Sequence, residues 1–378
     1  MKIVIAPDSF KGSLSAQQAA DAIARGVNIA CPRANCVIVP MADGGEGTVR
    51  SLVDATHGVI HAVTVTGPLG RPVDATYGML GDGRTAVIEM ASASGIQYVD
   101  ETTRNPLITT TYGTGELIRA ALDYGARKFI IGLGGSATND GGAGMAQALG
   151  VRLLDAQGNE LPRGGAALAS LERIETGGLD PRLDGTIIRL ASDVTNPLVG
   201  PHGASWVFGA QKGADAAMMM RLDSALAHYS QVIHSQLGVD VAHTPGAGAA
   251  GGLGAGCLAF LNASMRSGVD IVVEATGLRD LARDADYCIT GEGGIDGQTL
   301  YGKTPIGVAK TVKKASPHCL VIALAGSIGE GIEPLHDAGI DAIFGILPGI
   351  STLQQAVTQE RAEENLTRTA SNVARLFV

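Results

Sequence analysis

The sequence predicts an α/β protein with two domains, one doubly wound around a parallel sheet and one of mixed α/β type. Strand-like and helix-like segments alternate at both ends of the 378-residue chain, which is typical of a parallel sheet. The middle of the chain shows short strands and hairpin turns instead. A chain of this length also exceeds one ordinary hydrophobic core. We therefore predict a doubly wound domain from residues 1–58 and 265–378, and an inserted mixed α/β domain from residues 59–264.

The N-terminal elements follow the order strand, helix, strand, helix. A buried strand is predicted at Lys2–Ala6, and Ser15 with Gln18 forms a capping box that starts a helix. A second strand follows at Val37–Val39 and a second helix at Thr48–Thr56. Each strand runs into a polar loop, so these loops are expected at the carboxyl edge of the sheet.

The middle of the chain has a different pattern. Residues 60–91 contain short apolar stretches separated by the turn sequences GPLG and GDGR, which predicts hairpin-linked strands. Further strands are predicted at Lys128–Ile131 and Ile187–Leu190. Helices are predicted at Glu116–Tyr124 and Ala214–Leu237.

The last third returns to alternating strands and helices. Asp286–Thr290 is predicted as a strand that ends at the loop GEGGIDGQ. Thr304 is the predicted N-cap of a helix whose first residue is Pro305. The remaining predicted elements are strands at Leu320–Ala325 and Ala342–Leu347 and a surface helix at Glu360–Leu376.

Composition and charge exclude several classes of protein. The net charge of −9 argues against a nucleic-acid or anionic-membrane partner, which usually needs a basic face. No apolar run reaches the ~18 residues of a membrane span. The five cysteines form no C-x-x-C pair, so we expect buried thiols and a reducing cytoplasm. An anionic small-molecule substrate stays compatible with an acidic protein, since backbone amides, a few lysines and a metal ion can bind phosphate.

The segment Gly132–Gly142, GLGGSATNDGG, is the strongest candidate for a binding loop. An apolar strand leads into it, a helix-compatible run follows it, and five of its eleven residues are glycine. Glycine lets backbone N–H groups approach a ligand closely, and the N-terminus of a helix adds positive potential. The pattern predicts an anion site directly after a strand.

Two better-known nucleotide motifs match the sequence but lack the expected context. G-x-G-x-x-G occurs at Gly246, Gly248 and Gly251, but the preceding AHTP does not resemble a strand. The P-loop pattern G-x-x-x-x-G-K-T fits Gly297–Thr304, but the predicted strand ends too early, and Pro305 cannot donate an N–H. We interpret both as coincidental, and we keep Lys303 as a candidate phosphate contact because it precedes a helix.

Acidic residues gather after the predicted strands. Any one of them could be a turn or cap residue, but six beside glycine-rich loops favour a site that holds Mg²⁺ and orients a hydroxyl. These six are Asp8, Asp43, Glu46, Asp193, Glu292 and Asp296. Lys11, Lys212 and Lys303 are the loop lysines that this topology places within reach of a phosphate.

Taken together, these loops resemble the bacterial type-1 glycerate kinase family. The matching blocks include IAPDSFKGSLSA, ADGGEGT, GLGGSATNDGGAGMAQALG, SDVTNPLVGPHGA, FGAQKGA and TGEGGIDGQT, in order from residue 1 to about residue 350. The resemblance implies a flavodoxin-like domain built from both chain ends plus an inserted α/β domain. It also implies transfer of the γ-phosphoryl group of ATP to D-glycerate with Mg²⁺, most directly to the 2-hydroxyl.

The resemblance implies residue roles in outline. We expect Asp193 to be the base, with Lys11 and Lys212 offsetting charge on the transferring phosphoryl group. Mg²⁺ or hydroxyl contacts are expected from Asp43, Glu46, Glu292 and Asp296. Substrate or nucleotide binding is expected at Asp8, Ser9, Gly134, Gly135, Ser136, Thr138, Asn139, Asn196, Gln211 and Lys303.

Several alternatives stay open at this point. The acceptor could be the 3-hydroxyl of glycerate or another small hydroxy acid. An NAD(P)-dependent oxidoreductase using Gly246–Gly251 and a non-enzymatic sugar-acid binder are the hypotheses from other classes. The sequence leaves undecided which loop binds ATP and which binds glycerate. It also leaves open a homo-oligomeric state, domain closure and regulation.

Overall fold

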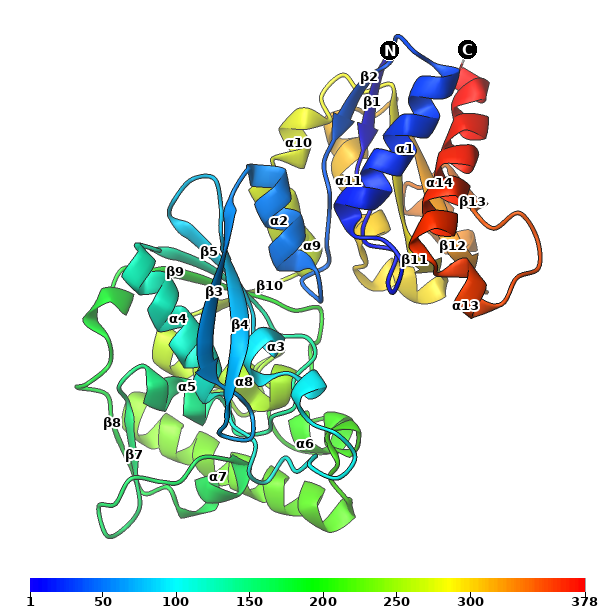
Figure 1. Cartoon of the computed structure of the whole chain (residues 1–378). Helices are drawn as coiled ribbons and strands as arrows, with labels where there is room; N and C mark the ends of the chain where they lie inside the picture. The colour runs from blue at the N-terminus through cyan, green and yellow to red at the C-terminus, as the bar shows by residue number, and fades with distance from the viewer. Residues whose placement is uncertain (378) are drawn as a thin grey trace. The chain divides into compact units, whose positions relative to one another are not determined.

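The computed structural model describes residues 1–377, and they form two compact units, each with its own sheet (Figure 1). The first unit contains Met1–Asp43, Arg50–His57 and the chain from Ser267 onward. The second contains Gly44–Val49 and Gly58–Arg266. The predicted α/β class is confirmed, while the predicted boundaries after residues 58 and 264 stay a prediction.

The first unit contains a five-stranded parallel sheet in the order β13-β12-β11-β1-β2. Its strands are β1 (Lys2–Ile5), β2 (Asn35–Ile38), β11 (Tyr287–Ile295), β12 (Leu320–Ile328) and β13 (Ala342–Gly345). Numbered in chain order, the strands follow the 2-1-3-4-5 order of flavodoxin-like sheets. In such sheets ligands bind at the carboxyl ends of the first and third strands, where the strand order reverses. That point lies between β1 and β11.

Helices complete this unit, and the two at the chain ends pack on each other. The capping box of Ser15 and Gln18 starts α1, as predicted. Gly26 lets α14 approach α1, since a Cβ there would lie 2.8 Å from the Cβ of Ala370. The helices are α1 (Ala16–Ala30), most of α2 (Thr48–Thr56), α9 (Gly268–Thr276), α10 (Leu278–Leu281), α11 (Thr304–Ala315), α12 (Glu333–Asp337), α13 (Leu353–Ala356) and α14 (Gln359–Ala374), with the 3₁₀ turns η5 (Gly297–Tyr301) and η6 (Arg375–Phe377).

The predicted end of the third strand was wrong. β11 does not end at Thr290 but continues to Ile295, because Glu292 and Ile295 pair with Ala325 and Ile328 of β12. Gly291 suits a strand here, since a Cβ would meet the backbone of Leu324. The strand therefore ends just before the P-loop match rather than well before it, and the segment after it is the 3₁₀ turn η5.

The predicted cap of α11 was also wrong. Lys303 has an extended backbone, with φ of −67° and ψ of 161°, and is the N-cap, so Thr304 is the first helical residue. The Thr304 hydroxyl does not cap its own helix; it donates to the carboxylate of Asp8. A contact far away in sequence therefore replaces the local cap.

The second unit is built on a six-stranded mixed sheet in the order β10-β9-β6-β5-β4-β3. The strands β5, β6, β9 and β10 are parallel, and β3, β4 and β5 form antiparallel pairs. The strands are β3 (Val59–Thr66), β4 (Pro72–Met79), β5 (Thr85–Glu89), β6 (Lys128–Gly132), β9 (Ile187–Ala191) and β10 (Ser264–Arg266), beside a separate hairpin of β7 (Arg152–Leu154) and β8 (Arg173–Glu175). The segments after β6 and β9 share one edge, because these neighbouring strands are parallel.

Helix α4 starts earlier than predicted, because Gly113 and Gly115 act as packing residues rather than breakers. A Cβ on Gly115 would lie 2.7 Å from that of Ala148 on α5. The helices of this unit are α3 (Ala91–Ser94), α4 (Tyr112–Tyr124), α5 (Ala143–Ala148), α6 (Ala204–Phe208), α7 (Ala216–Leu237) and α8 (Ala249–Leu261), with the 3₁₀ turns η1 (Ile96–Tyr98), η2 (Gly165–Ser170), η3 (Pro181–Leu183) and η4 (Ala210–Lys212).

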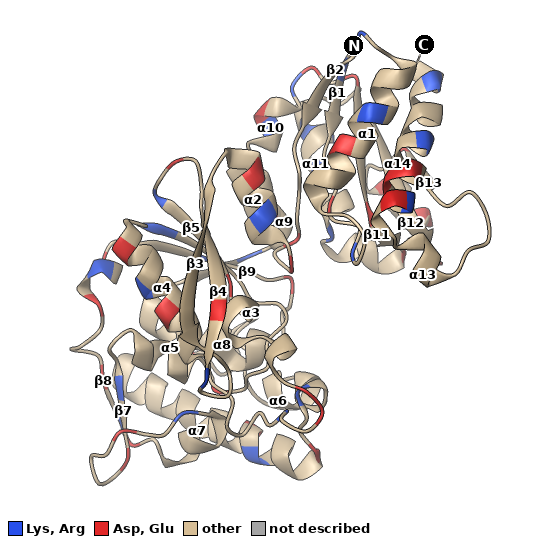
Figure 2. Cartoon of the chain, in the orientation of Figure 1, with Lys and Arg blue, Asp and Glu red and all other residues tan. Residues whose placement is uncertain are grey.

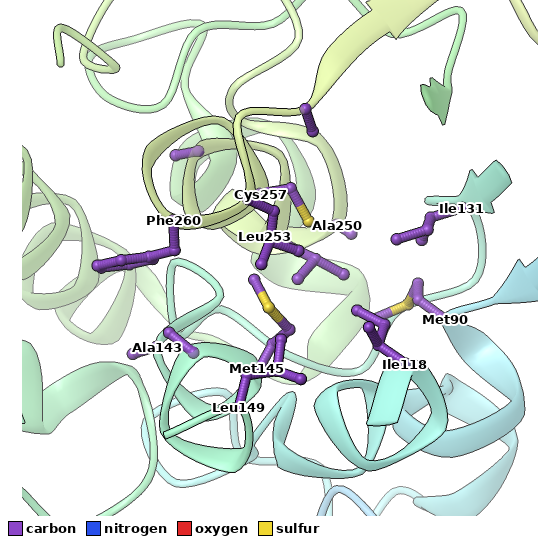
Figure 3. Close-up of a cluster of buried hydrophobic side chains, with 14 of the residues drawn as sticks. Met90, Ile118, Ile131, Ala143, Met145, Leu149, Ala250, Leu253, Cys257 and Phe260 are labelled. Atoms are coloured by element: carbon purple, nitrogen blue, oxygen red, sulfur yellow. The ribbon is translucent and has the colours of Figure 1, made fainter. Parts of the chain in front are cut away.

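The core of the second unit brings α5 and α8 together. Figure 3 shows Met145 of α5 and the adjoining Leu149 beside Leu253 and Cys257 of α8, and all four side chains are buried. Apolar burial of this kind is the main stabilising term for the sheet and its helices.

The start of α8 is kinked where it meets the glycine-rich loop. Ala250, Gly251 and Gly252 have φ of 54°, 66° and 87°. A Cβ on Gly251 would overlap the carbonyl oxygen of Thr138 and lie 2.7 Å from the Cα of Asn139. As predicted, no strand directly precedes Gly246 in the described chain. The glycines of the G-x-G-x-x-G match thus allow close backbone packing.

Charged residues of both signs lie on both units (Figure 2). Helix α14 carries Glu360, Glu363 and Glu364 in its first half, and Arg25 of α1 pairs with Glu363 at 3.0 Å. All five cysteines are free thiols, and burial is complete or nearly so for Cys31, Cys257, Cys288 and Cys319. Within residues 1–377, no helix combines the length and apolarity required to cross a bilayer.

The contact at Gly251 yields a stability prediction. Gly251→Ala should lower the free energy of unfolding by about 2 kcal/mol or more beyond the effect of Gly238→Ala. Gly238 is a matched control, because it lies in the same unit with a similar φ of 72°, and a methyl group there would meet no atom within 4 Å. Urea unfolding of both variants measures the difference, and equal losses would contradict the packing role of Gly251.

Candidate functional site

The carboxylate of Asp8 lies at the β1–β11 edge of the first sheet. Asp8 follows β1, and its backbone N–H donates to Gly291 O of β11 at 2.8 Å. Its Oδ1 accepts from Ser9 N at 2.6 Å, and its Oδ2 accepts from the Thr304 hydroxyl. Burial, with a smaller contribution from the nearby charge of Asp43, raises the pKa of Asp8 to about 6, although the Thr304 and Ser9 hydrogen bonds act in the opposite direction.

Glu292 of β11 is the second ionisable group at this edge. Its Oε1 accepts from Thr299 Oγ1 at 3.3 Å and lies 3.5 Å from Lys303 Nζ. Burial raises the pKa of Glu292 to about 7; Lys303 lowers it, and the charge of Asp8 raises it further. Two neighbouring carboxylates that both resist ionisation are typical of a functional site.

The other predicted residues of the first unit have more varied surroundings. Lys11 is exposed in the loop after β1. Asp296 is the N-cap of η5: its carboxylate accepts from Gln298 N at 2.9 Å, and it forms a capping box with Thr299. The structure thus brings into one unit the predicted residues Asp8, Ser9, Lys11, Asp43, Glu292, Asp296 and Lys303.

These carboxylates fit a hard divalent cation. The charge of Asp43 disfavours ionisation of Asp8, and the charge of Asp8 disfavours ionisation of Glu292, so a cation beside them would relieve both costs. In residues 1–377, however, no three Asp, Glu, His or Cys side chains converge as a ready-made metal cage. That is usual for Mg²⁺, which keeps waters and takes ligands from substrate phosphates.

In the second unit, the glycine-rich loop exposes its first residues. Gly134 and Gly135 are exposed, and Gly135 has φ of 74°. Within the described chain, the backbone N–H groups of Gly134 and Gly135 have no protein acceptor. Ser136 is 9% exposed. Free amides at a left-handed turn form a concave site that favours anions.

The next part of the loop is buried rather than available to a ligand. Thr138 and Asn139 have 0% exposure. Thr138 O accepts from Lys212 Nζ at 2.7 Å, and Asn139 Nδ2 donates to Ser205 Oγ at 3.0 Å. Thr138 Oγ1 and Asn139 Oδ1 are buried and lack a partner in the described chain.

Lys212 is also buried, although the sequence suggested a loop lysine facing phosphate. Its side chain ends under the loop, and the residue is 2% exposed. Burial lowers the pKa of Lys212 to about 7, while the charge of Asp140 opposes that shift. The Lys212 amine donates its hydrogen bond to the carbonyl of Thr138 rather than facing solvent.

Asp140 is a residue that sequence reasoning did not select. Its Oδ2 accepts from Thr111 N at 2.7 Å, from Thr111 Oγ1 at 2.9 Å and from Gly144 N at 3.3 Å, and its Oδ1 accepts from Gly142 N at 3.2 Å. Burial raises its pKa despite these donors. The run of threonines at residues 109–111 is the sequence feature that could have pointed to Asp140, because these threonines donate hydrogen bonds to the loop. Thr111 donates to Asp140, and Thr109 Oγ1 donates to Ala137 O at 2.9 Å.

The remaining predicted residues of the second unit lie in other segments. Asp193 is exposed, two residues after β9, and Gln211 is exposed in η4. Asn196 Nδ2 donates to His202 O at 2.8 Å. Glu46 lies near Glu89, a residue not predicted, whose carboxylate accepts from Val49 N at 2.9 Å. Burial raises the pKa of Glu89, and the charge of Glu46 adds to this.

Comparisons with known proteins cover the chain almost completely. The glycerate kinase family matches residues 3–378. Glycerate kinase from Bacillus subtilis (strain 168) is 56% identical over 99% of this chain and 97% of its own length. Glycerate 2-kinase from Escherichia coli (strain K12) is 54% identical, with the same coverage of both chains.

A solved structure agrees in fold as well. The crystal structure of a protein provisionally named glycerate kinase 2, from Salmonella typhimurium LT2, superposes with a TM-score of 0.91 at 52% identity. The match covers 100% of this chain and 98% of that one. The resemblance drawn from the loop sequences is confirmed. With family match, relatives and structure in agreement, the chain belongs to the glycerate kinase family and is a kinase.

Proposed function

We propose that this kinase transfers the γ-phosphoryl group of ATP to D-glycerate, forming 2-phosphoglycerate and ADP. The observation that carries the proposal is the 54% identity, over nearly the whole of both chains, to a relative named glycerate 2-kinase. The raised pKa values of Asp8 and Glu292 support it, because phosphoryl transfer relies on carboxylates that hold Mg²⁺ and orient the attacking hydroxyl.

In this proposal the first unit holds the metal and part of the phosphate charge. Asp8, Asp43 and Glu292 hold Mg²⁺, directly or through water, and Asp296 is a further predicted contact. When bound, Mg²⁺ neutralises charge that develops on the phosphates. Lys303 lies 3.5 Å from Glu292, and exposed Lys11 follows β1. Both amines add positive charge for the transferring group, and Ser9 is a predicted binding residue.

The second unit supplies an anion site and the base. The N–H groups of Gly134 and Gly135, with the Ser136 hydroxyl, bind either the glycerate carboxylate or an ATP phosphate. Asp193 accepts the proton of the attacking hydroxyl, a role that suits an exposed carboxylate after a strand. Glu46, Asn196 and Gln211 are further predicted contacts of this unit.

Alternative acceptors are distinguished by the product. The 3-hydroxyl of glycerate or another small hydroxy acid would leave the proposed machinery unchanged. The NAD(P)-dependent hypothesis has lost its support, because Gly246–Gly251 has no strand directly before it and lies against the Thr138–Asn139 backbone.

The first test is a coupled assay. Incubation with ATP, Mg²⁺ and D-glycerate, followed by enolase without a mutase, should give phosphoenolpyruvate, because enolase accepts 2-phosphoglycerate directly. Product that appears only after a mutase is added would assign the 3-hydroxyl. The absence of ADP formation would contradict the proposed function altogether.

Asp193→Asn tests the base. The variant should fold normally and lose about 10²-fold or more in kcat, since an amide cannot accept the hydroxyl proton. Asp337→Asn is the control, because Asp337 is an exposed carboxylate on α12. Steady-state kinetics with both substrates measure the effect, and wild-type turnover by Asp193→Asn would remove the residue from the mechanism.

Asp8→Asn should be more stable than the wild type but much less active. The pKa of Asp8 is about 6 in the folded protein, against an ordinary value of 3.8, so the wild-type folded state loses stability as pH rises through this window. The variant should gain ~1–3 kcal/mol of unfolding free energy at pH 8, and this gain should vanish near pH 4.

Urea unfolding at several pH values, alongside steady-state kinetics of ADP formation, measures both effects of Asp8→Asn. The Asp337→Asn variant again serves as the control and should show neither. A variant that is less stable than the wild type at pH 8 would show that the Asp8 charge is favourable to folding, contrary to the expectation.

A further inference from the structure

Polar side chains are buried along the second half of the glycine-rich loop, which follows the exposed residues Gly134 and Gly135. Lys212 Nζ donates to Thr138 O at 2.7 Å, although the two residues are 74 positions apart. Asp140, two residues further along the loop, supplies the opposing charge for Lys212. Both residues belong to the second unit and are at most 2% exposed.

Asp140 also fixes the elements on which the loop ends. Its carboxylate accepts from Thr111, the N-cap of α4, and from Gly142 and Gly144 at the start of α5. The Thr111 hydroxyl in turn accepts from Met145 N at 3.0 Å and donates to Asp140. One buried carboxylate thus joins the starts of two helices to the loop.

A contribution to folding stability does not by itself account for the burial of Asp140 and Lys212. A buried lysine with a buried carboxylate nearby is commonly no more stabilising than apolar side chains of the same volume. Thr138 Oγ1 and Asn139 Oδ1 beside it are buried without partners in the described chain, which is a further cost to folding. These groups are better explained by the loop conformation that they impose.

We propose that Asp140 and Lys212 are positioning residues for the anion site at Gly134–Ser136. They do not touch the substrate; they hold the Thr138 carbonyl and the following turn, so that the free amides of Gly134 and Gly135 keep one orientation before an anion binds. Preorganised donors bind an anion without the entropy cost of ordering a glycine loop. This inference rests on the proposed kinase function and changes the role of Lys212 from a phosphoryl contact to a support of the loop.

Kinetics of Lys212 variants separate the two roles. Lys212→Met removes the donor and should raise the KM of ATP or of D-glycerate about 10-fold, with kcat changed less than about 3-fold. Lys212→Gln keeps a neutral donor for the Thr138 carbonyl and should recover part of that affinity. Lys128→Met, an exposed lysine of the same unit at the start of β6, should behave as the wild type.

The opposite pattern would overturn the inference. If Lys212 contacts the transferring phosphoryl group, both variants should lose about 10²-fold or more in kcat, without rescue by glutamine. Unchanged kinetics in a folded Lys212→Met variant would also contradict it. If Lys212→Met does not fold, the Asp140→Asn/Lys212→Met double variant removes the lone buried charge, and it should fold with the same rise in KM.

Labelling of the wild-type protein gives a readout that does not depend on activity. After treatment with an amine-acetylating reagent, peptide mass spectrometry should find Lys212 unmodified with and without ATP, and exposed Lys11 modified. Modification of Lys212 that ATP prevents would place its amine in the nucleotide site and overturn the inference. An inactive wild type with a protected Lys212 would instead contradict only the proposed function.

Discussion

The buried backbone of the glycine-rich loop is the constraint that organises the second unit. A loop that leaves solvent must find hydrogen-bond partners for its N–H and C=O groups inside the protein. Here each partner comes from a different segment: Thr109 for Ala137 O, Lys212 for Thr138 O, and Gly251 O for Gly141 N. The kink of α8, the threonine run before α4 and the buried lysine each supply a hydrogen-bond partner to that backbone.

Three carboxylates that are wholly or largely buried are accommodated in two different ways. Burial raises the pKa of each of Asp8, Glu292 and Asp140. Asp140 is surrounded by four donors that come from the protein itself. Asp8 and Glu292 accept fewer hydrogen bonds, and each has an acidic neighbour that raises its pKa, although Lys303 partly offsets this for Glu292. A bound cation would favour the ionised form of both carboxylates. The first arrangement suits a structural support, and the second suits binding of a cation.

The sequence predicted what local chemistry controls. The Ser15–Gln18 capping box and the helix Thr48–Thr56 follow from neighbouring residues, and both are present. The full length of β11 depends on β12. By their residue types Gly291 and Glu292 are typical of a loop, and they are strand residues here because they pair with β12. The sheet order could not come from spacing either, since β1 pairs with β11, where the hydrogen-bonded Ala6 and Thr290 lie 284 positions apart.

For the candidate site, the sequence allowed a prediction of which loops and residue types take part, but not of which side chains are exposed. The loops after strands predicted Asp8 and Gly134–Ser136 as site residues, because glycine and aspartate are typical of such loops. Burial of Thr138, Asn139 and Lys212 depends on packing among the loop, α6, α7 and α8, which no local pattern encodes. Asp140 was missed for the same reason, since its donors lie on α4 and α5.

The packing of α1 on α14 has a consequence for how the chain reaches its native state during translation. A Cβ on Gly26 would lie 2.8 Å from that of Ala370, so the apolar face of α1 is covered only when almost the whole chain has left the ribosome. The segment Gly58–Arg266 emerges complete long before that and can fold first. The order of synthesis therefore allows the inserted unit to be completed before β11 and β12 are available to pair with the N-terminal strands.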